Sequence, residues 1–365
     1  MLRCLKRFMK VSIGSRIIDG PWGGGNLFVV NFKKFLQRNG HSVIHDLCEN
    51  DIDVILLTDP RSRKESSSTF NHEDILKYKK YVNPKVVVIQ RINECDERKG
   101  TDFINQYYLN ASECADHVIF VSKWLKNIFI NIGMEEKKTS VIMSGADEEI
   151  FNVEGLSKFN KEKIKFVTHH WSDHANKGFD VYKQFDELLS EKENKNLEFT
   201  YIGNVPEDVV FKNVIVKKPL SGNNLAEEIK KNNIYITASK NEPSGNHHIE
   251  AAQCGLPILY FNSGGIPEYC DGYGLEFYDN FEEKLYEIIE NFEHHKKKLK
   301  NYPFSAESMC EEFLECFNNI KANKERNDTE VIKILSNLFI FKNKVQKLLT
   351  TISIKQYLKM VLKKL

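Results

Sequence analysis

Short apolar runs rich in β-branched residues recur along the chain, and most of them are continuous rather than alternating. Runs of this kind are typical of strands that are covered on both faces of a sheet. We therefore predict about nine buried strands, within residues 53–59, 85–91, 117–122, 139–145, 164–170, 197–203, 213–218, 233–239 and 257–261.

Segments with helical periodicity lie between many of these runs. Residues 25–40 place apolar side chains at three- and four-residue spacing and end at Gly40, which suits the position just after a helix. Residues 223–233 repeat the pattern on a smaller scale. Alternation of strands and helices predicts an α/β protein with parallel, doubly wound sheets, whose ligands bind beyond the carboxyl ends of the strands.

The length of 365 residues favours two domains, and the polar stretch at 151–163 is the natural place to divide them. We predict Rossmann-like domains at 1–152 and 153–304, a helix at 305–325 that crosses back to the first domain, and a tail at 326–365. A closed eightfold barrel is the competing α/β layout. It is less favoured because several early strands are followed by long polar connections without an evident helix.

Composition and charge indicate which classes of partner and which cellular compartment to expect. A formal charge of +1 and a pI of about 7.6 give no global field that would recruit nucleic acid. The eight cysteines are scattered, which indicates reduced thiols in a cytoplasmic protein. The basic start MLRCLKRFMK lacks the apolar core of a signal peptide, and no apolar run reaches the about 18 residues of a membrane span.

The end of the chain differs in character. Residues 331–365 contain eight lysines and no acidic residue, and their apolar side chains recur at helical spacing. This basic amphipathic tail predicts either packing on the first domain, with self-association as a variant, or contact with an anionic membrane surface that carries a lipid-linked acceptor. Both readings stay open.

The segment NEPSGNHHIEAAQCG (241–255) holds the main candidate site. A helix should begin near Ser244–Asn246, with either residue as its N-cap, and its free N–H groups favour an anion such as a diphosphate. Glu242 and Glu250 should then lie roughly 8–12 Å apart, too far to share a proton. That spacing suits two carboxylates that hold opposite ends of an extended, hydroxyl-rich ligand.

This segment, with SGGIPE at 263–268, resembles the E-x7-E signature of family-four retaining glycosyltransferases, which have the GT-B fold. The resemblance implies that Glu242 contacts the transferred sugar and Glu250 the ribose of the donor nucleotide. It also implies donor contacts from the backbone at Ser244, Gly245, Asn246, Gly264 and Gly265.

Further segments carry the same resemblance over about residues 11–320. The stretch 114–151 is similar to a family segment that joins two strands, GPWGGGN (20–26) resembles the glycine-rich first loop, and NKGFDVY (176–182) resembles a Lys-Gly helix start. By this resemblance Gly24 and Gly25 approach the donor phosphate, and Lys177 binds the diphosphate and supports catalysis.

The family resemblance implies a function. A sugar would pass from a UDP- or GDP-linked donor to a hydroxyl of a glycan or lipid-linked acceptor, with retention, without a cofactor and without a metal. Cell-surface polysaccharide or glycoconjugate synthesis is the expected setting, in the cytoplasm or peripherally on the cytoplasmic face of the membrane.

Three positions depart from the family pattern. The family usually has an arginine near the position of Ser172, so a phosphate contact would have to come from elsewhere, with His170, His174 and Arg91 as candidates. Gln90 stands where the family often has a histidine that contacts the donor sugar. Ser144 replaces a usual asparagine in a turn.

Other readings remain. The chain could be a non-catalytic scaffold that binds a nucleotide sugar, or a sugar-nucleotide 2-epimerase on the same fold.

The pair Asp51-x-Asp53 resembles a metal-binding D-x-D, but it opens a strand, at the wrong end of a parallel sheet for a ligand. His248-x-Glu250 resembles part of a zinc-deaminase motif, but no P-C-x-x-C follows. We therefore predict no metal site.

Overall fold

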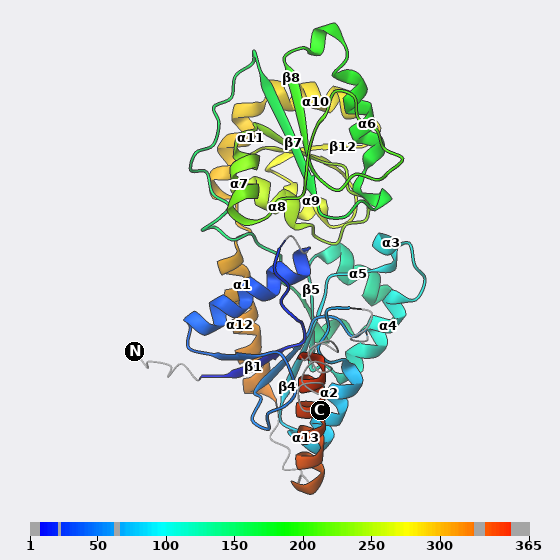
Figure 1. Cartoon of the computed structure of the whole chain (residues 1–365), viewed down its shortest axis with the longest axis vertical. Helices are drawn as coiled ribbons and strands as arrows, with labels where there is room; N and C mark the ends of the chain where they lie inside the picture. Colours follow the sequence, from blue (N-terminus) through cyan, green and yellow to red (C-terminus); the bar gives the residue numbers. More distant parts are fainter. Residues whose placement is uncertain (1–7, 21–22, 62–65, 325–332, 352–365) are drawn as a thin grey trace, which may run out of the picture.

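The computed structural model describes residues 8–20, 23–61, 66–324 and 333–351. Two six-stranded sheets form two layered bodies, one above the other in Figure 1, and all strand pairs are parallel. The strand orders are β2-β1-β3-β4-β5-β6 and β12-β11-β10-β7-β8-β9. The prediction of two Rossmann-like α/β domains is confirmed.

The first sheet is covered by helices on both faces. On one face α1 and α12 enclose an apolar core, and on the other α2, α4 and α5 enclose two smaller ones. Its strands are β1 (Lys10–Ile13), β2 (Ser42–Ile44), β3 (Val54–Leu57), β4 (Val87–Ile92), β5 (His117–Phe120) and β6 (Thr139–Val141). Its helices are α1 (Gly24–Arg38), α2 (His72–Tyr81), α3 (Asp96–Lys99), α4 (Ile104–Ala111), α5 (Lys123–Asn131) and α12 (Ala306–Asn323).

The second sheet has the same layered plan. Helices α7, α8 and α9 pack on one face, and α6, α10 and α11 on the other. Its strands are β7 (Ile164–His170), β8 (Leu197–Gly203), β9 (Ile215–Lys217), β10 (Ile234–Thr237), β11 (Ile258–Phe261) and β12 (Gly274–Phe277). Its helices are α6 (Phe179–Leu188), α7 (Gly222–Lys230), α8 (Asn246–Gln253), α9 (Ile266–Cys270), α10 (Phe281–Glu290) and α11 (Phe292–Lys298).

Two sequence-based expectations about the elements were wrong. Helices α2, α4 and α5 do lie in the connections of the early strands, so the stated reason for rejecting a barrel fails, although two open sheets exclude the barrel itself. Strands β1, β2 and β12 were not predicted. They are three or four residues long, β2 and β12 lie at sheet edges, and none is a continuous β-branched run.

The end of the chain returns to the first domain. Helix α12 packs along α1 through Phe28 and Phe313, whose ring centroids lie 5.1 Å apart, and through Phe32 and Phe317, at 5.6 Å. Helix α13 (Lys333–Thr351) follows and lies beside α2 (Figure 1). Of the predicted tail at 326–365, residues 326–332 and 352–365 lie outside the described residues. None of the described helices is both long enough and apolar enough to cross a bilayer.

Candidate active site

The carboxyl ends of the two sheets face each other, and side chains from both domains meet there. From the second domain, the Glu268 carboxylate accepts hydrogen bonds from the backbone N–H groups of Lys123 and Trp124 at the start of α5, at 2.8 and 2.7 Å. The Tyr269 hydroxyl accepts a hydrogen bond from the N–H of Ser144, at 2.9 Å. The Ser144 hydroxyl lies 3.3 Å from that of Ser244. These contacts join the two domains around the candidate site.

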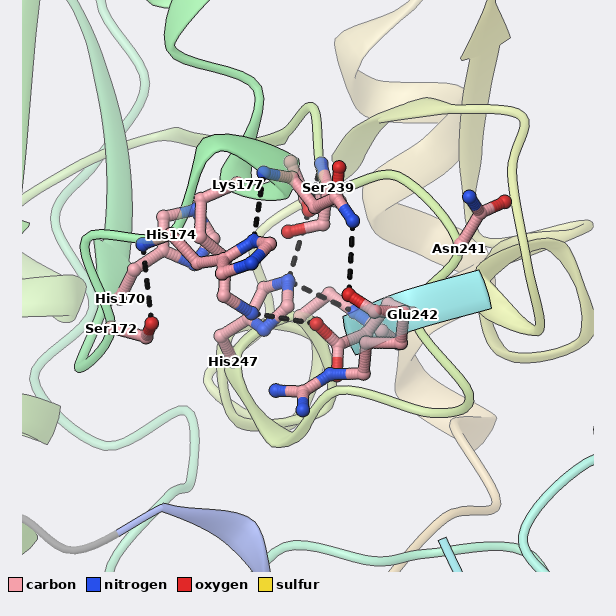
Figure 2. Close-up of polar contacts among 12 residues, drawn as sticks. His170, Ser172, His174, Lys177, Ser239, Asn241, Glu242 and His247 are labelled. Atoms are coloured by element: carbon pink, nitrogen blue, oxygen red, sulfur yellow. Dashed lines mark hydrogen bonds and ion pairs between the residues drawn. The ribbon is translucent and has the colours of Figure 1, made fainter. Parts of the chain in front are cut away.

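Glu242 lies at the centre of the site, between a cation from each domain. Its Oε2 accepts a hydrogen bond from Lys177 Nζ at 2.6 Å, and its Oε1 accepts one from Arg98 Nε of α3 at 2.9 Å. Arg98 also pairs with Glu94, at 2.8 Å. Figure 2 shows Lys177, Glu242, His170 and His247 gathered between the loops that follow β7 and β10.

The charges of this cluster depend on one another. Burial alone would raise the pKa of Glu242, but Arg98 and Lys177 lower it well below its usual range. Burial lowers the pKa of Lys177, and the neighbouring Glu242 opposes that shift. The ionised carboxylate has about four acceptor sites, and Lys177 and Arg98 use two of them. The remaining sites can accept hydrogen bonds from hydroxyl groups of a ligand.

A short turn before α6 positions Lys177. The His174 side chain accepts a hydrogen bond from the N–H of Asn176 at 3.2 Å and so caps this turn, while Ser172 accepts one from the N–H of His174. Gly178 follows with a φ of +82°, and a Cβ there would lie 2.2 Å from the carbonyl oxygen of Ala238. His174 is exposed, and its side chain stabilises the turn that carries Lys177.

Glu250 is held in a separate network one turn into α8. Its Oε2 lies 2.9 Å from Nε2 of His169, the penultimate residue of β7. The Tyr235 hydroxyl lies 3.2 Å from Nδ1 of the same imidazole and also accepts a hydrogen bond from the His169 N–H. Glu250 is only 5% exposed, so its carboxylate is fixed in orientation before any ligand binds.

Three further histidines lie next to Lys177 and Glu242 and are uncharged at neutral pH. Burial lowers the pKa of His170 and of His247 well below the usual value, and burial lowers that of His248 to about 3. The rings of His170 and His247 are 4.7 Å apart. His170 Nε2 lies 2.8 Å from the Tyr182 hydroxyl. A neutral His170 is a hydrogen-bonding group rather than a cation for a phosphate.

The start of α8 differs from the prediction. The N-cap is Gly245 rather than Ser244 or Asn246, and no side chain caps the helix. Gly245 has a φ of +77°, and a Cβ there would lie 2.7 Å from His247 Cε1 and 3.0 Å from Glu242 Cγ. Only glycine fits this backbone and this space, and no side chain caps the first N–H groups of α8.

The predicted glycines lie around this helix start. A Cβ at Gly24 would lie 2.8 Å from Oδ1 of Asn246, so the first turns of α1 and α8 approach each other, whereas Gly25 has open space around its Cβ position. Gly264 and Gly265 pack against the backbone of Glu242 and Pro243, and the Gly265 N–H donates a hydrogen bond to the Glu242 carbonyl at 2.8 Å. This glycine pair holds the Glu242 loop.

Gln90 and Arg91 lie at the end of β4, on the first-domain side. Gln90 Nε2 donates a hydrogen bond to the Tyr108 carbonyl at 3.2 Å. Arg91 is 4% exposed, its guanidinium lies 4.1 Å from the Phe28 ring centroid, and its Nε has no hydrogen-bond partner among the described residues. Burial lowers its pKa to about 10. Neither side chain touches Glu242.

Unpartnered polar atoms collect at these strand ends. Eleven buried side-chain N or O atoms of the described residues have no hydrogen-bond partner, and five of them belong to Gln90, Arg91, His170, Ser239 and His248. Buried polar groups are normally paired, so such a group indicates a ligand or water position. Of the predicted residues, Glu242 and Lys177 are in direct contact, whereas Gln90 and Arg91 contact Tyr108 and Phe28 of the first domain.

Sequence reasoning missed two charged or titratable partners, Arg98 and His169. Arg98 lies in the short helix α3 that follows the carboxyl end of β4, where ligand contacts of parallel sheets are expected. His169 is the penultimate residue of β7, beside His170. Both signals were visible, but neither indicates which carboxylate the side chain would reach.

No cluster of ligating side chains suited to a metal ion occurs in the described part of the chain. Asp53 accepts a hydrogen bond from the Lys10 N–H at 2.8 Å and pairs with Lys321, while Asp51 pairs with Lys10. These aspartates lie at the amino end of the first sheet, away from the site.

The chain thus consists of two parallel α/β domains, with a buried acid held between a cation from each domain. Residues 154–307 match the model of the family described as glycosyl transferases group 1, which indicates a glycosyltransferase domain in this part of the chain. The match contains Lys177, Glu242 and Glu250. No curated protein matches the sequence.

Solved glycosyltransferase structures share the whole two-domain architecture. A glycosyltransferase from Rickettsia africae matches with a TM-score of 0.63 and 14% identity, over 87% of this chain and 100% of the other. HepE from Anabaena in complex with UDP and glucose matches with a TM-score of 0.62 and 13% identity, over 85% and 100%. Sucrose-phosphate synthase from Thermosynechococcus elongatus matches with a TM-score of 0.63 and 13% identity, over 87% and 100%. At these identities the likeness shows the fold, which is that of GT-B enzymes.

Proposed function

We propose that the protein is a retaining glycosyltransferase that moves a sugar from a UDP- or GDP-linked donor to a hydroxyl of a glycan or lipid-linked acceptor. The observation that carries this proposal is the buried Glu242 carboxylate between Lys177 and Arg98, eight residues before the equally buried Glu250. Similar folds have been solved with UDP and glucose or with ADP, which supports a nucleoside diphosphate as the common part of the donor.

The proposed donor lies across the start of α8. Its ribose hydroxyls hydrogen-bond to Glu250, its diphosphate lies near the open N–H groups of α8 and the Lys177 ammonium, and its sugar hydroxyls reach Glu242. In this arrangement Lys177 would contact both the diphosphate and the region of the transferred sugar, since its Nζ lies 2.6 Å from the Glu242 carboxylate.

The proposed reaction requires stabilisation of the negative charge that develops on the leaving diphosphate. The bond between the anomeric carbon and the diphosphate oxygen breaks, the acceptor oxygen bonds to the same carbon on the same face, and the acceptor proton passes to the leaving phosphate oxygen. Preorganised donors of the kind that Lys177 and the α8 amides provide typically contribute ~2.7–4 kcal/mol each to lowering such a barrier. The proposed reaction uses no cofactor and no metal.

Cell-surface polysaccharide or glycoconjugate synthesis, in the cytoplasm or on the cytoplasmic face of the membrane, is the setting we propose. The basic C-terminal region supports a location near a membrane that holds the acceptor.

A donor panel tests the function. Purified protein is incubated with UDP- and GDP-sugars, with and without simple glycan acceptors, and release of nucleoside diphosphate is measured. We expect release with at least one donor, lost in Glu242→Gln and kept in Glu227→Gln, a matched change at an exposed position of α7. Nucleotide binding without release would favour the scaffold, and exchange of the C2 proton in deuterated water without transfer would favour the epimerase.

A further inference from the structure

Helix α13 uses one face to dock on the first domain. The Phe339 ring packs on Tyr78 of α2, with centroids 6.3 Å apart. Asn343 is buried and donates a hydrogen bond from Nδ2 to the Leu47 carbonyl at 3.1 Å, and Lys347 pairs with Asp46 at 2.6 Å. This docked face fixes the rotation of the helix, as seen beside α2 in Figure 1.

The opposite face of α13 carries large apolar side chains that nothing covers in the described structure. At about 100° per residue they lie within an arc of roughly 80° centred opposite Asn343. They are Leu338, Phe341, Val345 and Leu348, which are 59%, 66%, 40% and 61% exposed. We call these four residues the apolar stripe. A continuous apolar stripe of this kind on a folded surface indicates a binding surface.

Lysines flank the apolar stripe on both sides. Lys342 lies on one edge and Lys344 on the other by the same helical rotation, and both are exposed. The nearest first-domain acids are already paired, Asp46 with Lys347 and Glu49 with Lys10. Since α13 contains no acidic residue, its own charged side chains are all lysines.

We propose that the apolar stripe of α13 binds an anionic lipid surface, with α13 lying in the plane of the interface. An apolar stripe between lysines is the pattern of interfacial helices: the stripe enters the boundary of the acyl region and the lysines contact the headgroups. The docked face would keep the first domain attached to the bilayer. This proposal does not depend on the reaction that the protein catalyses.

Vesicle flotation of the full chain tests the proposal. Vesicles of phosphatidylcholine alone are compared with vesicles that contain about one quarter phosphatidylglycerol. We expect binding to the anionic vesicles only. Leu338→Ser/Phe341→Ser should lower the partition coefficient at least about 10-fold, because side chains of this size gain most of their transfer free energy on burial. Lys342→Gln/Lys344→Gln should lower it roughly fivefold per lysine.

Matched variants elsewhere serve as controls. Val153→Ser/Val210→Ser removes two apolar side chains that are 62% and 74% exposed, and Lys297→Gln/Lys298→Gln removes two exposed charges from α11. Both should bind vesicles like the unchanged protein, and circular dichroism should show all variants folded. Equal binding to neutral vesicles, no binding at all, or unchanged binding of the stripe variant would overturn the proposal. So would a dimer in light scattering that the stripe variant abolishes, because the stripe would then bind a second copy.

Discussion

Acidification should destabilise the second domain through the buried histidines of the site. His170, His247 and His248 are neutral in the folded protein, because burial lowers the pKa of each. The unfolded chain binds a proton at each of them below about pH 6.5. Since the unfolded state then holds more protons, stability must fall as the pH falls below that value. The lowered pKa of Glu242 acts in the same direction, but only at much lower pH, because that carboxylate is ionised in both states near pH 5.5.

The size of the effect follows from the linkage relation. At pH 5.5 a histidine that stays neutral in the folded state costs about 1.4 kcal/mol of unfolding free energy, so three cost at most about 4 kcal/mol. For a domain of 150–250 residues, each kcal/mol shifts the Tm by roughly 2–4 °C. Lowering the pH from 7.5 to 5.5 should therefore lower the Tm by roughly 8–16 °C through these residues.

Differential scanning calorimetry of the full chain at the two pH values measures this shift. In His247→Gln/His248→Gln the part of the Tm drop that comes from His170, His247 and His248 should shrink by about two thirds. The contribution of His45, His117 and His295, whose pKa values burial also lowers, should remain. His294→Gln, at an exposed position of α11, should keep the full drop. An equal drop in the double variant and in the unchanged protein would refute the assignment of neutral buried histidines.

Three further predictions concern ligand binding, catalysis and closure. Lys177→Ala should lower kcat about 100-fold or more, because a preorganised cation at the leaving group is lost; nucleotide-release assays check this, and undiminished turnover would remove Lys177 from the mechanism. Glu250→Ala should weaken nucleoside diphosphate binding by roughly 10- to 150-fold, the value of a charged hydrogen bond; calorimetric titration measures it, and an unchanged Kd would exclude the ribose contact. Arg98→Gln removes the cation that joins α3 of the first domain to Glu242 of the second, so the ligand-free protein should become more open. Small-angle scattering should then give a larger radius of gyration, and an identical profile would contradict a closing role.

The fold was predictable where strands are buried on both faces, because such strands consist almost entirely of apolar residues. Strands such as β3 and β11 are covered on both faces and therefore appear as continuous apolar runs. The edge strands β2 and β12 have partly exposed side chains and short pairings, so their sequences carry no such signal. Their place in the sheets comes from tertiary pairing rather than from local preference.

The site was predictable only in part, for a related reason. The spacing of Glu242 and Glu250 and the helix between them are local features, and the sequence indicated them. The pairs Arg98–Glu242 and His169–Glu250 join residues 144 and 81 positions apart, and their formation depends on how the domains and strands pack. Helix-capping preference also favoured Ser244 or Asn246 as the N-cap, but the crowding of Glu242 and His247 around a positive φ selects Gly245.

The departures from ordinary folding preference are themselves concentrated around Glu242. Asn241 has a φ of +52° and is the one residue other than glycine with a positive φ in the described chain. Beside it, a buried carboxylate holds two cations, and His170 and His248 each leave a buried ring nitrogen without a partner. Each of these features costs stability, and apolar residues of similar size would often fold as well or better. A sequence constrained by folding alone would have no reason to collect them at the carboxyl ends of two facing sheets. Their collection there is what binding and reaction of a charged, hydroxyl-rich ligand would require.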